Sequence, residues 1–237
     1  MPEVDAAARL SVLDRVMADP PNVHPGSNVG VWLTDRRCYE LMARTLPESA
    51  ATLETGLGLS TVLLASWGCR HTCVVGDQAE VDGLTAYCAD RSIDLAAVSF
   101  EVGRSEDVLP GLDLGAVDLV LIDGGHGFPT PVIDWFYGCR TLNVGGVVVV
   151  DDMQLPSVAD YLGRYLELDP SWLSVAREPK WAAFRRTSAA ALGGEWTTQS
   201  EFLGGPRVSL ANRAKIAGAK VLERTKLGRD LLRARGT

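Results

Sequence analysis

Between residues 51 and 152 the sequence alternates short apolar runs with segments of helical pattern. The runs are continuous in Val, Ile and Leu, which is typical of strands that are buried on both faces. Helices between such strands cover both faces of a parallel sheet. The chain is therefore predicted to be an α/β protein with a doubly wound, mostly parallel sheet. The expected strands lie at 51–55, 71–77, 96–102, 117–123 and 145–152.

The flanking regions extend this core. Two strand-like runs, 171–178 and 180–186, are separated only by a bend at Pro179 and predict an antiparallel hairpin. Helices are expected before the first strand, at 5–18 and 35–45, and between the strands, at 59–68, 79–91, 130–142 and 156–168. We divide the chain into a helical N-terminal cap (1–48), a core (49–188), and a linker with a basic C-terminal helix (189–237).

Charge is distributed unevenly along the 237 residues. The last 31 residues, 207–237, carry a net charge of +7, whereas the rest of the chain carries −14. An acidic body argues against nucleic acid as a partner. The basic segment is expected to pack on the acidic body or on a second subunit as a homo-oligomer contact. Binding to an anionic membrane surface or an acidic partner is the alternative, and disorder is the third.

The expected compartment is the cytoplasm. The N-terminus carries acids throughout and lacks the apolar core of a signal peptide. No run approaches the roughly 20 apolar residues that span a bilayer. The five cysteines are interpreted mostly as small buried hydrophobic residues of a reducing compartment.

A glycine-rich turn, LETGLGLST, follows the first strand and begins a helix. Gly56 and Gly58 allow the backbone to approach a ligand closely, and the free N–H groups at a helix start favour an anion. A dinucleotide-binding fold would require a third glycine, where this chain has Ser60 or Thr61. The turn thus predicts a cofactor loop that includes Ser60, although a tight strand-to-helix turn is the simpler alternative.

Two acids accompany this loop. Glu54 ends the first strand just before the glycines, and Asp77 ends the second strand, 21 residues after Gly56. A carboxylate at the position of Asp77 would accept hydrogen bonds from ribose hydroxyls.

This combination resembles the class I S-adenosylmethionine-dependent methyltransferases, over about residues 28–186. The resemblance implies a Rossmann-like sheet of seven strands, the last antiparallel, in agreement with the predicted hairpin. It also implies that Glu54, Gly56 and Gly58 line the methionine part of the cofactor and that Asp77 contacts the ribose.

Two further segments resemble that family. VGRSEDVLP (102–110) is similar to the loop on the adenine side of the cofactor. Relatives often have an acid at the position of Arg104, so Ser105 is the expected contact. The stretch at 28–32 resembles an N-terminal loop that covers the cofactor in some members.

Acids also follow the fourth and fifth strands, in LIDGGHGF and VVVVDDM. Asp123 leaves the fourth strand, and Asp151 and Asp152 leave the fifth at the same edge of the sheet, where neighbouring strands lie about 5 Å apart. Clustered carboxylates repel each other unless a cation lies between them, and oxygen ligands suit Mg²⁺. Each acid, taken alone, would also be explained as a cap or a strand end.

The two linked motifs resemble the metal-dependent O-methyltransferases, a branch that includes the catechol-type enzymes and the macrolide-sugar and aminocoumarin tailoring enzymes. The resemblance implies that Asp123, Asp151 and Asp152 hold the metal and that His126 is the general base. The chain departs from several relatives at Gly125, where they carry an acid.

The resulting prediction is methyl transfer from S-adenosylmethionine to a hydroxyl of a small molecule, sugar or natural product. Neutral His126, next to Asp123, would take the hydroxyl proton, and a divalent metal would position the acceptor. Two alternatives stay open: a metal-independent methyltransferase acting on an amine or a carboxylate, and a cofactor-binding protein without catalysis.

Overall fold

The computed structural model describes residues 5–23, 33–189 and 192. The chain divides into two compact units, Met1–Leu192 and Gly193–Thr237. The expected loop at 28–32 and the expected basic helix lie outside the described residues, as does most of the predicted linker.

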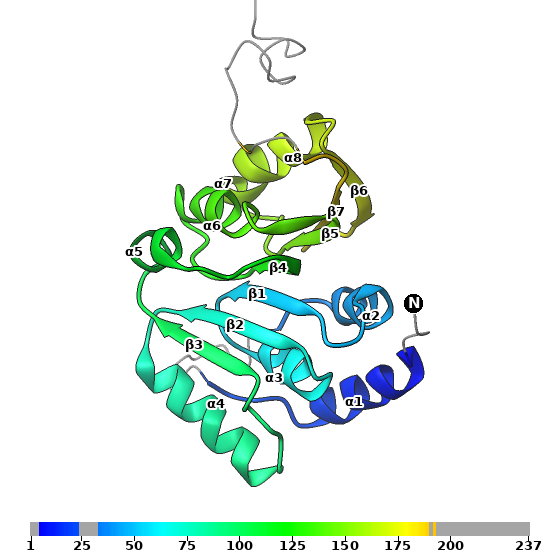
Figure 1. Ribbon diagram of the computed structural model, residues 1–237, viewed down its shortest axis with the longest axis vertical. Coiled ribbons are helices and arrows are strands. Elements are labelled where there is room, and N and C mark those ends of the chain that lie inside the picture. Colours follow the sequence, from blue (N-terminus) through cyan, green and yellow to red (C-terminus); the bar gives the residue numbers. More distant parts are fainter. Residues whose placement is uncertain (1–4, 24–32, 190–191, 193–237) are drawn as a thin grey trace, which may run out of the picture. The chain divides into compact units, whose positions relative to one another are not determined.

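Within the described residues, the strands form one seven-stranded sheet with the order β3-β2-β1-β4-β5-β7-β6 (Figure 1). The strands from β3 to β5 are parallel, whereas β7 pairs antiparallel with both β5 and β6. The predicted mixed sheet with a C-terminal hairpin is thereby confirmed. The strands are β1 (Ala51–Thr55), β2 (Arg70–Val75), β3 (Val98–Val102), β4 (Val117–Ile122), β5 (Leu142–Val150), β6 (Trp172–Arg177) and β7 (Ala182–Arg186).

The helices follow the predicted segments with small differences at their ends. Asp5, Asp35 and Asp77 each begin a helix by accepting a hydrogen bond from a backbone N–H of its first turn. The segment predicted as one helix at 156–168 is divided into three turns, with a π-helical turn in the middle. The helices are α1 (Ala6–Ala18), α2 (Arg36–Thr45), α3 (Leu59–Ser66), α4 (Gln78–Asp90), α5 (Ser105–Val108), η1 (Leu109–Gly111), α6 (Thr130–Gly138), α7 (Pro156–Val158), η2 (Ala159–Gly163) and α8 (Arg164–Leu168).

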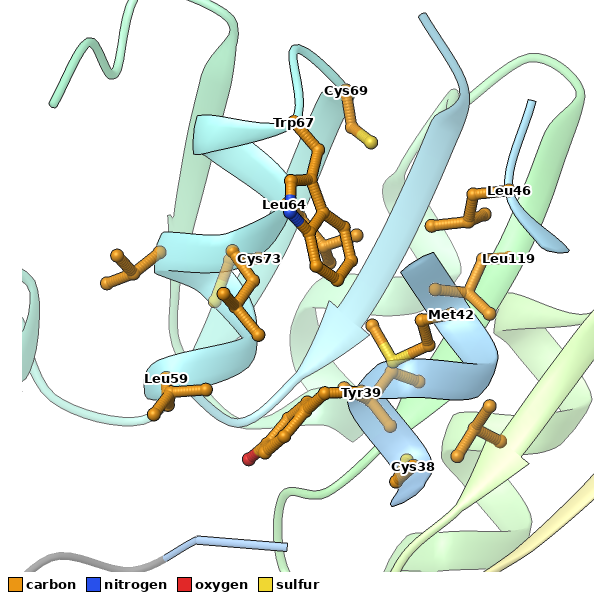
Figure 2. Packing of buried hydrophobic residues seen from close by; sticks show 14 of the residues in the cluster. Cys38, Tyr39, Met42, Leu46, Leu59, Leu64, Trp67, Cys69, Cys73 and Leu119 are labelled. Atoms are coloured by element: carbon orange, nitrogen blue, oxygen red, sulfur yellow. The ribbon is translucent and has the colours of Figure 1, made fainter. Parts of the chain in front are cut away.

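The sheet separates two hydrophobic cores, because successive strand residues point to opposite faces. Leu119 and Leu121 pack with α1–α4, whereas Val120 and Ile122 pack with the helices from α6 to α8. Figure 2 shows the first core, where Tyr39 and other α2 side chains meet α3 and the strands. Burial on both faces explains the uninterrupted apolar strands.

All five cysteines are free and buried, as predicted. No described helix combines the length and the apolar composition required to cross a membrane.

Candidate active site

The carboxyl ends of three neighbouring strands coincide at one edge of the sheet. Ile122 of β4 is in register with Thr55 of β1 and with Val150 of β5. Consequently Asp123 follows directly beside the glycine loop, with its N–H bonded to the Thr55 carbonyl at 3.0 Å, and the Asp151 N–H bonds the Ile122 carbonyl at 3.0 Å. The register therefore brings the two predicted motifs to the same place.

A cavity of about 420 Å³ lies at this edge, a volume typical of small-molecule sites. Its wall combines the N-terminal segment, the glycine loop, the turns after β2, β3, β4 and β5, and the turn between β6 and β7. The lining residues are Leu33, Tyr39, Gly56, Leu57, Gly58, Leu59, Ser60, Val74, Gly76, Glu80, Gly103, Arg104, Ser105, Glu106, Asp123, Gly124, Gly125, His126, Thr130, Asp151, Asp152 and Lys180.

The glycine loop needs its first glycine for two reasons. Gly56 has φ +90°, and a Cβ atom there would lie 2.2 Å from the Asp123 carbonyl oxygen. Any other residue would clash with the backbone after β4. A Cβ at Gly58 would meet no atom within 4 Å, so its space is open.

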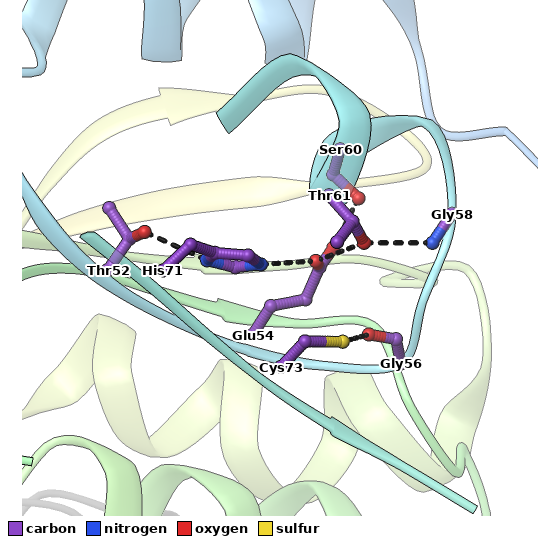
Figure 3. Close-up of polar contacts among 8 residues, drawn as sticks. All are labelled: Thr52, Glu54, Gly56, Gly58, Ser60, Thr61, His71 and Cys73. Atoms are coloured by element: carbon purple, nitrogen blue, oxygen red, sulfur yellow. Dashed lines mark hydrogen bonds and ion pairs between the residues drawn. The ribbon is translucent and has the colours of Figure 1, made fainter. Parts of the chain in front are cut away.

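Glu54 lies in a buried polar network behind this loop (Figure 3). Its carboxylate accepts hydrogen bonds from the hydroxyls of Ser60 and Thr61, the latter at 2.7 Å, and lies 3.1 Å from His71 Nε2. Thr61 Oγ1 in turn accepts from the Gly58 N–H at 3.1 Å. Among the described residues, Glu54 does not line the cavity, whereas Ser60 does. The structure thus places Glu54 as a support of the loop, and its direct contact with the cofactor stays a prediction.

The residues expected at the nucleoside end are placed differently from one another. Asp77 is exposed and caps α4, accepting from the Ala79 N–H at 2.9 Å. Glu80, one helical turn after Asp77, lines the cavity and was not predicted. The contact of Asp77 with the ribose stays a prediction. Ser105 lines the cavity, and its contact with the cofactor stays a prediction. Burial raises the pKa of Asp134 to about 6, against the opposing effect of hydrogen bonds from Thr55 and Ser105.

Asp123, His126 and Asp152 form a half-buried cluster whose ligand atoms lie within 4.8 Å of one another. His126 Nε2 is 2.9 Å from Asp152 Oδ2. Asp152 has φ +54°, in the left-handed region that a non-glycine residue rarely adopts. Such backbone outliers concentrate at functional sites. Gln154 Nε2 donates to the other Asp152 oxygen at 2.6 Å.

Asp151 lies next to this cluster, and its charge acts on Asp123. Burial, followed by the negative charges of Asp151 and Glu54, raises the pKa of Asp123 well above its usual range. Asp151 also has hydrogen-bonding and ionic partners of its own. The carboxylate of Asp151 accepts from Thr34 Oγ1 at 2.6 Å and lies 3.3 Å from Lys180 Nζ. Neither Thr34 nor Lys180 was predicted, because a lone threonine before a helix and a lone lysine in a hairpin turn carry no signal in sequence.

The donor atoms fit a divalent ion. Ligands about 2.1 Å from one Mg²⁺ lie at most about 4.2 Å apart, and the ligand atoms of Asp123, His126 and Asp152 lie within the slightly larger limit of 4.8 Å of one another. Burial is the main cause of the raised pKa of Asp123, and the charges of Asp151 and Glu54, whose repulsion a cation would relieve, add to it. Asp123 and Asp152 both belong to this group of potential ligands. Asp151, the third predicted ligand, would have to share its oxygens with Thr34 and Lys180.

Comparison with known proteins agrees with this geometry. Residues 53–153 match the family described as a methyltransferase domain. No curated protein matches the chain. The matched segment runs from β1 to just beyond β5 and thus contains both the glycine loop and the acid cluster.

Solved structures share the fold over most of the chain. One is cofactor-bound Rv0187 from MTB, with 20% identity, a TM-score of 0.55, and coverage of 76% of this chain and 88% of that chain. The O-methyltransferase TomG from Streptomyces achromogenes, solved with S-adenosylmethionine, has 16% identity, a TM-score of 0.55, and coverage of 78% and 90%. The SAH-bound methyltransferase PaMTH1 from Podospora anserina has 13% identity, a TM-score of 0.53, and coverage of 78% and 88%.

At these identities the likeness establishes a Rossmann-like methyltransferase fold. The domain match covers 101 of the 237 residues and, together with this fold, supports an S-adenosylmethionine-dependent methyltransferase. Of these neighbours, TomG was solved with S-adenosylmethionine and PaMTH1 with SAH.

Proposed function

We propose that the enzyme transfers the methyl group to a hydroxyl of a small molecule, with His126 as the general base. The observation that carries this proposal is the pair formed by His126 Nε2 and Asp152 Oδ2, 2.9 Å apart. Both residues line the cavity, and the glycine loop lies on the same cavity wall. A proton acceptor is therefore available beside the expected methyl donor.

The pair defines how the proton moves. Asp152 is an acceptor, so the neutral imidazole carries its proton on Nε2 and leaves Nδ1 to take the hydroxyl proton. The carboxylate of Asp152 then stabilises the imidazolium that forms, as in other His–Asp pairs. Bound S-adenosylmethionine supplies an electrophilic methyl on its sulfonium. The cavity wall contributes by holding acceptor and donor at reacting distance.

We further propose that a divalent ion, Mg²⁺ in the first instance, binds at the acid cluster. Asp123 and Asp152 would hold it, whereas Asp151, the third ligand expected from the sequence, already has Thr34 and Lys180 as partners. When bound, the ion would lower the pKa of the acceptor hydroxyl and fix its orientation. An acceptor with two adjacent hydroxyls suits this arrangement.

One observation favours the metal-independent alternative. Lys180 Nζ lies 3.3 Å from Asp151 and 4.0 Å from Asp152, so the protein itself supplies one positive charge to the acids. In that alternative His126 keeps its role, and chelation leaves activity unchanged.

The proposal is tested with radiolabelled S-adenosylmethionine and a panel of phenols and sugars that carry adjacent hydroxyls. We expect His126→Gln to lower kcat by about 10²–10⁴-fold, the usual contribution of a general base, with unchanged affinity for S-adenosylhomocysteine. Gln78→Ala, on the exposed surface of α4, is the control. Full activity of His126→Gln would overturn the assignment of the base.

The metal is tested separately. We expect Mn²⁺, used as a paramagnetic probe, to bind the purified enzyme, and EDTA to abolish methyl transfer. Asp123→Asn and Asp152→Asn should each weaken Mn²⁺ binding. Full activity in EDTA would refute the metal and leave the metal-independent alternative.

A further inference from the structure

The two oxygens of the Asp151 carboxylate have different partners from different parts of the chain. Oδ1 accepts the Thr34 hydroxyl at 2.6 Å, and Oδ2 faces Lys180 Nζ at 3.3 Å. The same ammonium donates to the Leu33 carbonyl at 2.6 Å. Three contacts therefore join the segment before α2, the end of β5 and the β6–β7 turn. The Asp151 side chain is only 1% exposed.

The segment joined in this way forms part of the cavity wall. Leu33 and Tyr39 both line the cavity. Tyr39 is buried, and its hydroxyl accepts the Thr34 N–H at 3.2 Å. Burial and the nearby Asp123 raise the pKa of Tyr39, which stays a neutral phenol. The position of this wall is thus fixed by the hydrogen bonds at Thr34 and Leu33, and these end on Asp151 directly or through Lys180.

We propose that Lys180 and Thr34 are positioning residues that clamp the wall formed by Leu33 and Tyr39 onto Asp151. In this arrangement Asp151 serves as the anchor of the cofactor-enclosing wall, and the ion of the proposed function is left to Asp123 and Asp152. This inference rests on the proposed function only in that the cavity binds S-adenosylmethionine, and it does not require that a metal binds.

Charge and geometry both support this division of tasks. A fully buried carboxylate needs a hydrogen-bonded counter-charge, and Lys180 together with Thr34 supplies one to Asp151. Asp152, by contrast, is half-buried; its oxygens have His126 and Gln154 as partners, and Lys180 Nζ lies farther from it, at 4.0 Å. An ion on Asp151 would have to displace an ammonium and a hydroxyl that are already in place.

The clamp is tested by calorimetric titration with S-adenosylhomocysteine and by Mn²⁺ binding measured by electron paramagnetic resonance. Thr34→Val and Lys180→Met should each raise the Kd for S-adenosylhomocysteine about tenfold or more, the effect of losing one hydrogen bond to a charged group. Mn²⁺ affinity should be kept in Thr34→Val and kept or increased in Lys180→Met, since a positive charge is removed. Asp123→Asn and Asp152→Asn should instead weaken Mn²⁺ binding and leave the Kd for S-adenosylhomocysteine unchanged.

Arg37 provides a matched control. Its guanidinium bonds Glu178 at 2.9 Å and joins α2 to the same hairpin turn, but on the exposed surface. We expect Arg37→Met to leave both affinities within twofold of those of the wild type. If the clamp variants acted only by loosening α2 in general, Arg37→Met would change the two affinities in the same way as Thr34→Val and Lys180→Met.

Two results would overturn the clamp. One is an unchanged Kd for S-adenosylhomocysteine in Thr34→Val and Lys180→Met. The other is loss of Mn²⁺ binding in Asp151→Asn with cofactor affinity intact. If Lys180→Met does not fold, Thr34→Val decides, because it keeps the Asp151–Lys180 pair. If wild-type enzyme binds no Mn²⁺, the metal of the proposed function fails, and the cofactor titration still decides the clamp.

Discussion

At Gly56 the chain turns out of β1 with φ +90° and passes directly against the backbone that follows β4. A side chain there would strain the loop twice, through its backbone conformation and through a 2.2 Å contact with the Asp123 carbonyl oxygen. The bond that joins the glycine loop to the acid cluster is that of the Asp123 N–H to the Thr55 carbonyl, at 3.0 Å.

Gly56→Ala should therefore destabilise the protein. We expect the free energy of unfolding to fall by about 2–4 kcal/mol, the sum of the strain at a positive φ and the clash. Urea unfolding followed by circular dichroism measures it. Gly58→Ala is the matched control: its Cβ has free space, so stability should change little while affinity for S-adenosylhomocysteine falls. Equal stability of the two variants would contradict this account.

At the scale of elements, the hydrogen bond of Asp134 ties α6 to β1. Thr55 Oγ1 donates to its carboxylate at 2.7 Å. The carboxyl is fully buried, and its pKa is raised from 3.8 to about 6. The folded state consequently holds this proton more tightly than the unfolded chain does.

The sign of the resulting pH dependence follows from linkage. The contribution of Asp134 to stability is fully present below pH 3.8 and is lost as the pH rises through about 6. We expect a loss of about 3 kcal/mol over this window. Asp134→Asn should remove this part of the dependence, as measured by urea unfolding between pH 4.5 and 7.5. If the stability of the wild type and that of Asp134→Asn depend on pH in the same way, Asp134 is not the group responsible.

For the whole molecule, residues of both hydrophobic cores line the cavity: Tyr39 and Leu59 belong to the first core and Val74 to the second. A ligand that bridges the glycine loop, the turns and the N-terminal wall binds the folded state alone. Its binding must therefore raise the free energy of unfolding by mass action.

S-adenosylhomocysteine at about 100 times its Kd should add about 2.7 kcal/mol of stability and raise Tm by roughly 5–10 °C. Differential scanning fluorimetry measures the shift, with ATP as the comparison ligand. An equal shift with ATP, or none with S-adenosylhomocysteine, would disagree with a methyltransferase cofactor site at this cavity.

Sequence reasoning predicted the fold well because its signals are local. Continuous apolar strands, helical spacing and the glycine turn each follow from neighbouring residues, and the ends of β1 and α1 were predicted to within one residue. The same reasoning predicted one helix at 156–168, where a π-helical turn interrupts the α-helical pattern. It did not predict Glu80, which lines the cavity, and the contact of Asp77, the cap of α4, with the ribose stays a prediction.

The sequence by itself determined the parallel sheet, the glycine loop and the exit of acids from two neighbouring strands, because each depends on short-range pattern. Only the tertiary structure decided which acid has which partner. Thr34, Asp151 and Lys180 lie more than 100 residues apart at their extremes, and their contacts arise from strand register and from the return of the hairpin beside β5. No local pattern encodes that register, so the pairing of Asp152 with His126 and of Asp151 with Lys180 could be found only in the folded chain.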